Sequence, residues 1–265
     1  KAITDANTAT GMDIIRFDIP VSGVCTFRPQ SPLPAITDPV IIDGTSQPGY
    51  SGMPLIEIDG SNAGSAVGLN ISAGNSTVKG LIINNFNGNG VFLWLGGGNI
   101  IEGSFIGTDA TGTIDHGNYG SGIAITSPNN RIGNAGGAVN VISANDIGGI
   151  FISGASATGN RIVHSHIGAS VDGNNAIGNN LAGIYVLNSS VDTIGGVLPG
   201  ERNIISGNIQ SGISLRGQSA QSILIQGNYI GTESNGSLSL GNLNGIEILP
   251  EVDSTGTPSH ITIGG

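Results

Sequence analysis

The sequence predicts an all-β protein, in which the chain winds into a single-stranded parallel β-helix with three strands in each coil. Three observations predict this fold: a long internal repeat, short alternating runs of Ile, Val and Leu, and glycine at 46 of the 265 positions. So much glycine argues against helices, because each glycine inside a helix costs about 0.5–1 kcal/mol relative to alanine. The regular apolar runs argue against disorder, so we expect the glycines at the bends of a solenoid.

The repeat sets the length of the coil. The tripeptide at 106–108 returns at 167–169 and 230–232, at intervals of 61 and 63 residues. Two Gly-Ile-x-Ile-like tetrads fall within each interval, so one unit is two coils and the chain has about eight coils. The tetrads begin at Gly68, Gly90, Gly122, Gly149, Gly183, Gly212 and Gly245. The longer insertions are expected at 108–120, 169–181 and 232–243.

The first 62 residues depart from this repeat. Residues 1–62 are predicted to form an N-terminal cap and the first coils, and residues 63–265 the regular coils of one continuous solenoid. We expect a short helix over residues 2–10, because a solenoid needs cover for its apolar end. The Asp43-Gly44 and Asp59-Gly60 pairs are expected to form turns. The chain stops partway through a repeat, so its C-terminal end is expected to be truncated.

Asparagines close several of the apolar runs, among them Asn145, Asn208 and Asn228. At such positions in a β-helix, side-chain amides can bond to one another along the axis and form ladders. We therefore assign these asparagines a structural role.

Composition excludes some classes of function. Eight Lys and Arg against a net charge of -10 cannot form a phosphate-binding stripe, so no nucleic-acid partner is expected. No run of about 18 apolar residues occurs, so no membrane span is expected. Cys25 is the single cysteine; it is expected to be a small buried hydrophobe rather than a reactive thiol.

Residues 31–50 and the Ile-Gly-Thr…Gly-Asn…Gly-Ile units give the chain a family likeness. Together with residues 2–7 and 13–17 they resemble bacterial right-handed parallel β-helix repeat proteins whose N-terminal region carries the CSLREA motif, although the motif itself is absent here. The likeness covers essentially the whole chain. It implies the pectin-lyase-like superfamily fold and an extracellular or cell-surface location. It implies no activity, because a fold alone does not define a function.

One outward line of the predicted helix is rich in aromatic residues. In a Gly-Ile-x-Ile tetrad the residues beside x point inward and x points outward. This places Phe92, Phe151 and Tyr185 on one line, with Trp94 two residues beyond Phe92. A stripe of exposed rings suits a polysaccharide or a cell-surface glycan. The alternatives are that inserted loops cover the rings, or that the rings pack against another chain, so self-association stays open.

Candidate acid–base residues lie in and near the long insertions. They are Asp109, Asp115, His116, Arg161, His164, His166 and Asp172. Matching loops lie two coils apart, about 10 Å at ~4.8 Å per coil, close to the ~6.5–9.5 Å between the carboxyl groups of inverting glycosidases. A basic group beside acids would serve β-elimination of a uronate polymer. The alternative is that these residues are solvated or form turns.

The function predicted from these features is a non-catalytic extracellular or cell-surface module with a structural, adhesion or assembly role, in contact with a glycan. The alternative is a polysaccharide lyase or glycoside hydrolase, which would need a groove beside the aromatic line that holds two carboxylates, or a carboxylate with Arg or His. No metal or cofactor is expected. Calcium stays open for the loop at 107–112, which has oxygen donors but lacks the dense aspartates of a calcium loop.

Overall fold

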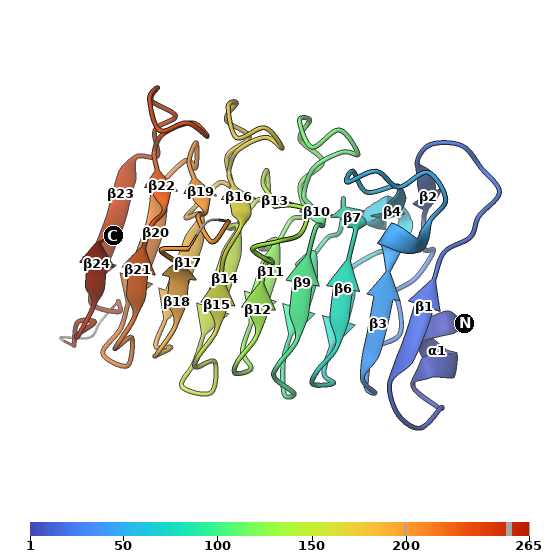
Figure 1. Ribbon diagram of the computed structural model, residues 1–265. Helices are drawn as coiled ribbons and strands as arrows, with labels where there is room; N and C mark the ends of the chain where they lie inside the picture. Colours follow the sequence, from blue (N-terminus) through green and yellow to red (C-terminus); the bar gives the residue numbers. More distant parts are fainter. Residues whose placement is uncertain (199, 253–255, 265) are drawn as a thin grey trace.

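A computed structural model describes residues 1–198, 200–252 and 256–264, and these form one solenoid of short strands (Figure 1). Gly265, the last residue of the predicted repeat region, lies outside the described residues. The chain passes in turn through three parallel sheets, here named A, B and C, which hold nine, eight and seven strands. The predicted all-β parallel β-helix with three strands per coil is confirmed.

From β3 onward the chain enters sheets A, B and C in turn, so each sheet receives every third strand; before β3, β1 joins sheet A and β2 joins sheet B. Sheet A contains β1 (Asp13–Arg16), β3 (Val40–Asp43), β6 (Thr77–Lys79), β9 (Ile100–Glu102), β12 (Arg131–Ile132), β15 (Arg161–Ile162), β18 (Thr193–Gly195), β21 (Leu224–Gln226) and β24 (Thr262–Gly264). Sheet B contains β2 (Cys25–Phe27), β4 (Ile56–Asp59), β7 (Leu81–Asn84), β10 (Phe105–Ile106), β13 (Asn140–Ile142), β16 (Ser165–Ile167), β19 (Ile204–Ile205) and β22 (Tyr229–Ile230). Sheet C contains β5 (Leu69–Ile71), β8 (Val91–Leu93), β11 (Ile123–Ile125), β14 (Ile150–Ser153), β17 (Ile184–Leu187), β20 (Ser211–Arg216) and β23 (Asn244–Leu249).

The N-terminal helix α1 (Ala2–Ala6) is shorter than the helix expected over residues 2–10. The side chain of Asn7 explains its end, because it donates to the carbonyl of Ala35 and accepts from the N–H of Thr37, which ties the chain to a neighbouring loop. Cys25 is half-buried on β2, at the border of the hydrophobic core, and is a free thiol.

The two Asp-Gly pairs form turns, as predicted. The carboxylate of Asp43 accepts from the N–H of Thr45 at the start of the 3-10 turn η1 (Gly44–Ser46). The carboxylate of Asp59 does the same for Ser61 at η2 (Gly60–Asn62). Strand pairing runs on past this region without a break, since β3 pairs with β6 and β4 with β7.

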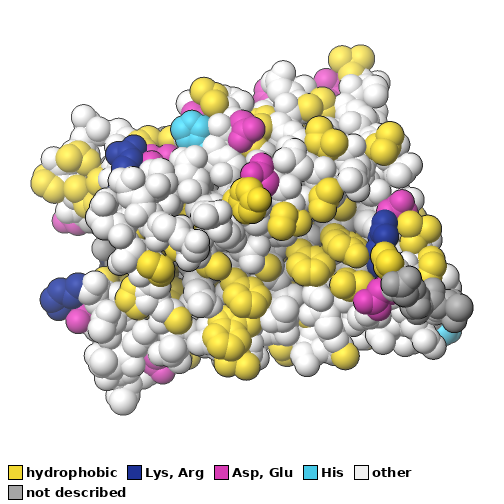
Figure 2. Space-filling model, turned by 180° about the vertical axis from the view of Figure 1, so that it is seen from behind, with side chains coloured by type: hydrophobic (Ala, Val, Ile, Leu, Met, Phe, Trp, Pro, Cys, Tyr) yellow, Lys and Arg dark blue, Asp and Glu magenta, His cyan; other side chains and the backbone are white. Residues whose placement is uncertain are grey.

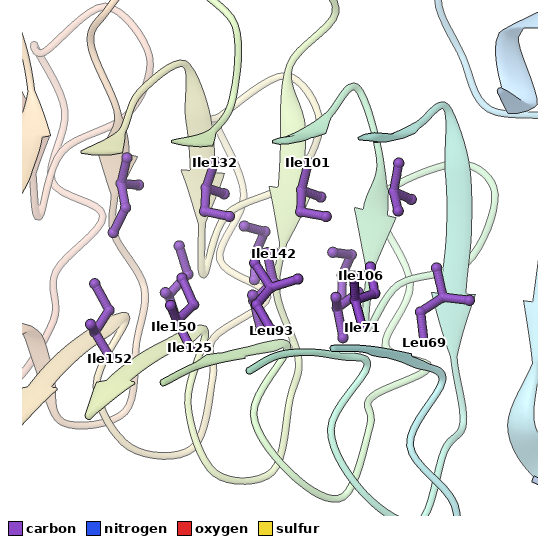
Figure 3. Packing of buried hydrophobic residues seen from close by; sticks show 14 of the residues in the cluster. Leu69, Ile71, Leu93, Ile101, Ile106, Ile125, Ile132, Ile142, Ile150 and Ile152 are labelled. Carbon is purple, nitrogen blue, oxygen red and sulfur yellow. The ribbon is translucent and has the colours of Figure 1, made fainter. Parts of the chain in front are cut away.

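The core consists of inward-facing aliphatic side chains stacked coil on coil (Figure 3). In sheet A, Ile101 lies in register with Ile132, and in sheet B Ile106 lies in register with Ile142. All four are fully buried. Each such side chain contributes about 1.5–3 kcal/mol through its removal from water, so the repeated isoleucines determine which face of every strand points inward.

Asparagine ladders hold the turns between the sheets. The longest runs along the turn from sheet B to sheet C, where each side-chain amide donates to the side-chain oxygen of the next at 2.9–3.0 Å. Its members are Asn118, Asn145, Asn179, Asn208 and Asn242. A second ladder joins Asn99, Asn130 and Asn160, and Asn203 donates to Asn228 in a third. The ladder role predicted for Asn145, Asn208 and Asn228 is confirmed.

The three long insertions fold over the outer face of sheet B. They stand along one edge of the solenoid, beside β10, β16 and β22 (Figure 1). The first two loops meet where the N–H of Val171 donates to the carbonyl of Gly112, and Ser234 of the third loop donates to Asn174 of the second. Beneath the first loop lies a second small core made of Ile82, Phe105 and Val141. The loops therefore cover the outer side chains of sheet B at Phe105, His166 and Tyr229.

Candidate functional site

The aromatic line predicted from the tetrads lies on the outer face of sheet C. Phe92 on β8, Phe151 on β14 and Tyr185 on β17 occupy one register, with Ala124 of β11 between the first two. All three rings and that of Trp94, just beyond β8, are partly exposed. Figure 2 shows this side of the molecule, where hydrophobic side chains gather across the surface and charged groups are sparse.

Neighbouring groups fix the four rings in place. Phe92 and Trp94 stack with their centroids 6.1 Å apart and 7° between their planes. The indole N–H of Trp94 donates to the side-chain oxygen of Asn70 at 2.6 Å. Phe151 and Tyr185 lie 5.2 Å apart on adjacent coils. Rings held in this way present preformed apolar surfaces, so little conformational entropy is lost when a ligand lies on them.

A shallow groove lies beside Phe151 and Tyr185, next to the turns from sheet B to sheet C. Its first part is an apolar hollow of about 100 Å³, lined by Ile147, Phe151, Leu181 and Tyr185. The adjoining part is a hollow of about 220 Å³ that shares Leu181 and Tyr185 and has polar walls. Those walls are formed by Gln210, Ser211, Ser214, Arg216 and Glu247.

The polar end of the groove contains one ion pair. The Arg216 guanidinium lies 3.0 Å from the Glu247 carboxylate and 5.9 Å from the centre of the Tyr185 ring. Burial raises the pKa of Tyr185; Arg216 lowers it, but the charges of Glu251 and Glu247 raise it further. Its hydroxyl therefore stays protonated near neutral pH and is able to donate a hydrogen bond. The alternation that turns Ser214 to the outer side of β20 does the same for Arg216 two residues later, although Ser214 itself is only 4% exposed. This alternation was the signal in the sequence for Arg216.

The acidic loop residues proposed for acid–base chemistry lie elsewhere, over sheet B. The Asp109 carboxylate accepts hydrogen bonds from Thr111, Thr113 and Ile114 within its own loop. Burial raises the pKa of Asp109, but these hydrogen bonds, Thr111 first, outweigh it and hold the pKa below its ordinary value. Asp115 accepts from the N–H of Gly117, two residues further on. Both carboxylates close turns, which is the alternative that the sequence left open.

Asp172 serves its loop in the same way. It accepts from the hydroxyl of Ser170 and from the N–H of Asn174, and the Ser170 bond is the main reason that its pKa is lowered. His166 lies beneath this loop with its Nδ1 3.0 Å from the Ser170 carbonyl. Burial lowers the pKa of His166, which keeps the ring neutral, so Nδ1–H donates to that carbonyl.

The remaining basic candidates join no common site with these acids. Arg161, on sheet A, forms an ion pair with Glu201. His164 occupies the turn from sheet A to sheet B with a φ of 47°, a value that glycine adopts more easily than any other residue. His116 lies half-buried where the first loop returns to the turn, and its backbone N–H donates to the carbonyl of Gly107. The structure thus separates the aromatic candidates on sheet C from the acid–base candidates around sheet B.

Across residues 1–198, 200–252 and 256–264, no three His, Cys, Asp or Glu side chains come together as a metal site would require. Within the same ranges, no helix has the length and apolar character needed to cross a membrane. A hollow of about 380 Å³ lies at the N-terminal end and is lined mainly by apolar side chains such as Ile15, Phe17 and Ile42.

No family model and no curated protein matches this chain. Solved structures that are similar to it include a tailspike protein and an epimerase. The Dettilon tailspike protein (gp208) is 17% identical with a TM-score of 0.54, over 88% of this chain and 41% of the tailspike. A mutant of the periplasmic alginate epimerase AlgG is 15% identical with a TM-score of 0.50, over 79% of this chain and 50% of the epimerase. The chain is a right-handed parallel β-helix protein that spans half or less of either structure.

Proposed function

We propose that this protein is an extracellular or cell-surface module that binds an extended glycan along the outer face of sheet C. The observation that carries the proposal is the line of fixed, partly exposed rings at Phe92, Trp94, Phe151 and Tyr185, which lies beside a groove. Flat apolar rings with polar neighbours suit the faces and hydroxyls of sugars. A line that crosses several coils suits a polymer better than a single sugar.

Two similar folds support a glycan partner. One is a tailspike protein, and the other is an epimerase named for alginate, a polysaccharide. The epimerase is periplasmic by name, which supports a location outside the cytoplasm. The identities are low, so the proposal rests on the rings of this chain and not on these proteins.

The chemistry of the face favours binding over catalysis. Arg216 and Glu247 neutralise each other, and the carboxylate also accepts from the hydroxyl of Ser214 at 3.1 Å. The raised pKa of Tyr185 leaves its phenol protonated, so it is a poor general base near neutral pH. We therefore propose a structural, adhesion or assembly role, in which the rigid solenoid presents the binding face.

Isothermal titration calorimetry with a panel of polysaccharides and oligosaccharides tests the proposal. We expect Trp94→Ala and Tyr185→Ala each to weaken binding about tenfold, because a well-placed aromatic contact is worth roughly 1–1.5 kcal/mol. Tyr229→Ala is the matched control, since Tyr229 is a partly exposed ring on β22 of sheet B, away from sheet C. Equal affinities for all three variants and the parent protein would refute the proposed face.

A second candidate function is a polysaccharide lyase or glycoside hydrolase. The observation that favours it is the Arg216–Glu247 pair beside Tyr185, because the sequence argument required a carboxylate with a basic group in this groove. A depolymerisation screen, run with and without calcium, tests it. Release of new chain ends that Glu247→Gln abolishes, in a variant that remains folded, would favour the enzyme. Intact polymers would favour the binding module.

A further inference from the structure

We infer that the face on sheet C selects an uncharged glycan and rejects polyanionic ones such as uronate polymers. The inference rests on the proposed function and adds the chemical class of the ligand. It comes from the distribution of charge over the face, which is independent of the aromatic rings.

Acidic groups outnumber basic ones on this face. Among the described residues of the sheet C strands and of the turns that flank them, Arg216 is the one Lys or Arg. Its charge is balanced by Glu247 at 3.0 Å. Two more carboxylates border the face: Asp146, which accepts from Asn180 on the ridge above the groove, and Glu251, which accepts from Asn188 on the opposite side.

The other cations of the chain are not free to compensate. Five of them form ion pairs away from sheet C: Lys1 with Asp5, Arg28 with Asp59, Lys79 with Asp43, Arg131 with Glu102 and Arg161 with Glu201. Arg202 lies 4.0 Å from the ring centre of Tyr229, on the outer face of sheet B. Arg16 belongs to β1 of sheet A. The whole chain carries a net charge of -10. A polyanion would therefore meet a repulsive field at this face.

The uncharged polar groups on this face are suited to neutral sugars. Beside the rings it presents the hydroxyls of Thr126 and Ser153 and the amide of Gln210, which can donate to and accept from sugar hydroxyls. Phe92 and Ser214 are four coils apart in register, a distance of about 19 Å at ~4.8 Å per coil. A run of several pyranose rings would span it.

Matched pairs of hexasaccharides that share a backbone and differ only at C6 provide the test. Mannohexaose is compared with hexamannuronate, and cellohexaose with hexaglucuronate, by calorimetry on the intact protein at low salt. We expect a neutral member to bind at least about tenfold more tightly than its acidic partner. Raising the ionic strength to about 0.15 M should narrow the ratio, because salt screens exposed charges.

A charge variant separates electrostatics from shape. Glu247→Gln combined with Glu251→Gln leaves the charge of Arg216 unbalanced. The ratio of the affinity for the neutral hexasaccharide to that for the acidic one should therefore fall several-fold. A thermal melt of the double variant checks that it remains folded. An acidic member that binds as tightly as its neutral partner, or a ratio that the double variant leaves unmoved, overturns this inference but leaves glycan binding intact. If no member of any pair or polysaccharide panel binds, the proposed function itself fails.

Discussion

Asp192 takes the place of an asparagine at the end of a buried ladder. Its side chain is 1% exposed, and its Oδ1 accepts from the N–H of Asn160. The hydroxyl of Ser189 lies within hydrogen-bond distance of both the carbonyl of Ala157 and Oδ2 of Asp192, at 2.6 Å from the latter. One hydroxyl has one proton to donate, so both contacts are satisfied when Asp192 is protonated and donates to Ser189. Burial disfavours the charged form as well, and it raises the pKa of Asp192 from 3.8 to about 6.

The raised pKa predicts the pH dependence of stability. Between pH 4 and pH 6 the unfolded chain releases the Asp192 proton while the folded protein retains it, so the contribution of this group to the free energy of unfolding falls as pH rises and is constant above pH 6. Asp192→Asn keeps the donor and the acceptor without the charge. We expect it to stabilise the protein by about 1–3 kcal/mol at pH 7.5 and little at pH 4.

Thermal melts of the parent protein and Asp192→Asn between pH 4 and pH 8 measure this difference. The difference in Tm between the two proteins should grow as the pH rises from 4 to 6. A gap that is equally large at pH 4 and pH 7.5 would show that packing, not ionisation, distinguishes the two proteins.

At the scale of the element, the turns depend on the asparagine ladders. Asn145 is fully buried, donates to Asn179 at 3.0 Å and accepts from Asn118 at 3.0 Å. Asn145→Ala would remove the acceptor of the buried backbone N–H of Asn118 and the side-chain donor to Asn179, at a cost of about 2–4 kcal/mol. Asn180→Ala, one residue beyond the ladder on the exposed surface, should cost about 0.5 kcal/mol or less.

Chemical denaturation of the two variants checks this prediction. If Asn145→Ala is as stable as Asn180→Ala, the ladder contributes nothing measurable to the free energy of unfolding of the stacked coils.

At the scale of the whole molecule, the sequence predicted some features residue by residue and others not at all. The register of Phe92, Phe151 and Tyr185 followed from the tetrads, because a buried apolar period of two allows only one face to point inward. The path of the long insertions did not follow, since it depends on contacts between coils, such as that of Val171 with Gly112. The tetrads also place Arg216 and Glu247 on the outer side of adjacent strands β20 and β23, but their ion pair depends on the conformations of both side chains and was not predicted.

The solenoid also determines how stability is distributed along the chain. Each coil packs against its two neighbours alone, so central coils gain from both sides and terminal coils from one. Hydrogen exchange followed by mass spectrometry should therefore show the slowest exchange in β9 to β17 and the fastest in β24, whose residues are all exposed.

Two variants test the coupling between coils. Ile142→Ala, at a fully buried central position, should speed exchange in the coils on both sides of it, because the cavity left by the side chain lowers the free energy of unfolding by about 2–5 kcal/mol. Ile263→Ala, at a position 52% exposed in β24, should leave the central coils unchanged. A single exchange rate for every strand in both variants would mean that the molecule opens as one unit, and that coupling between coils exceeds the stability of any one of them.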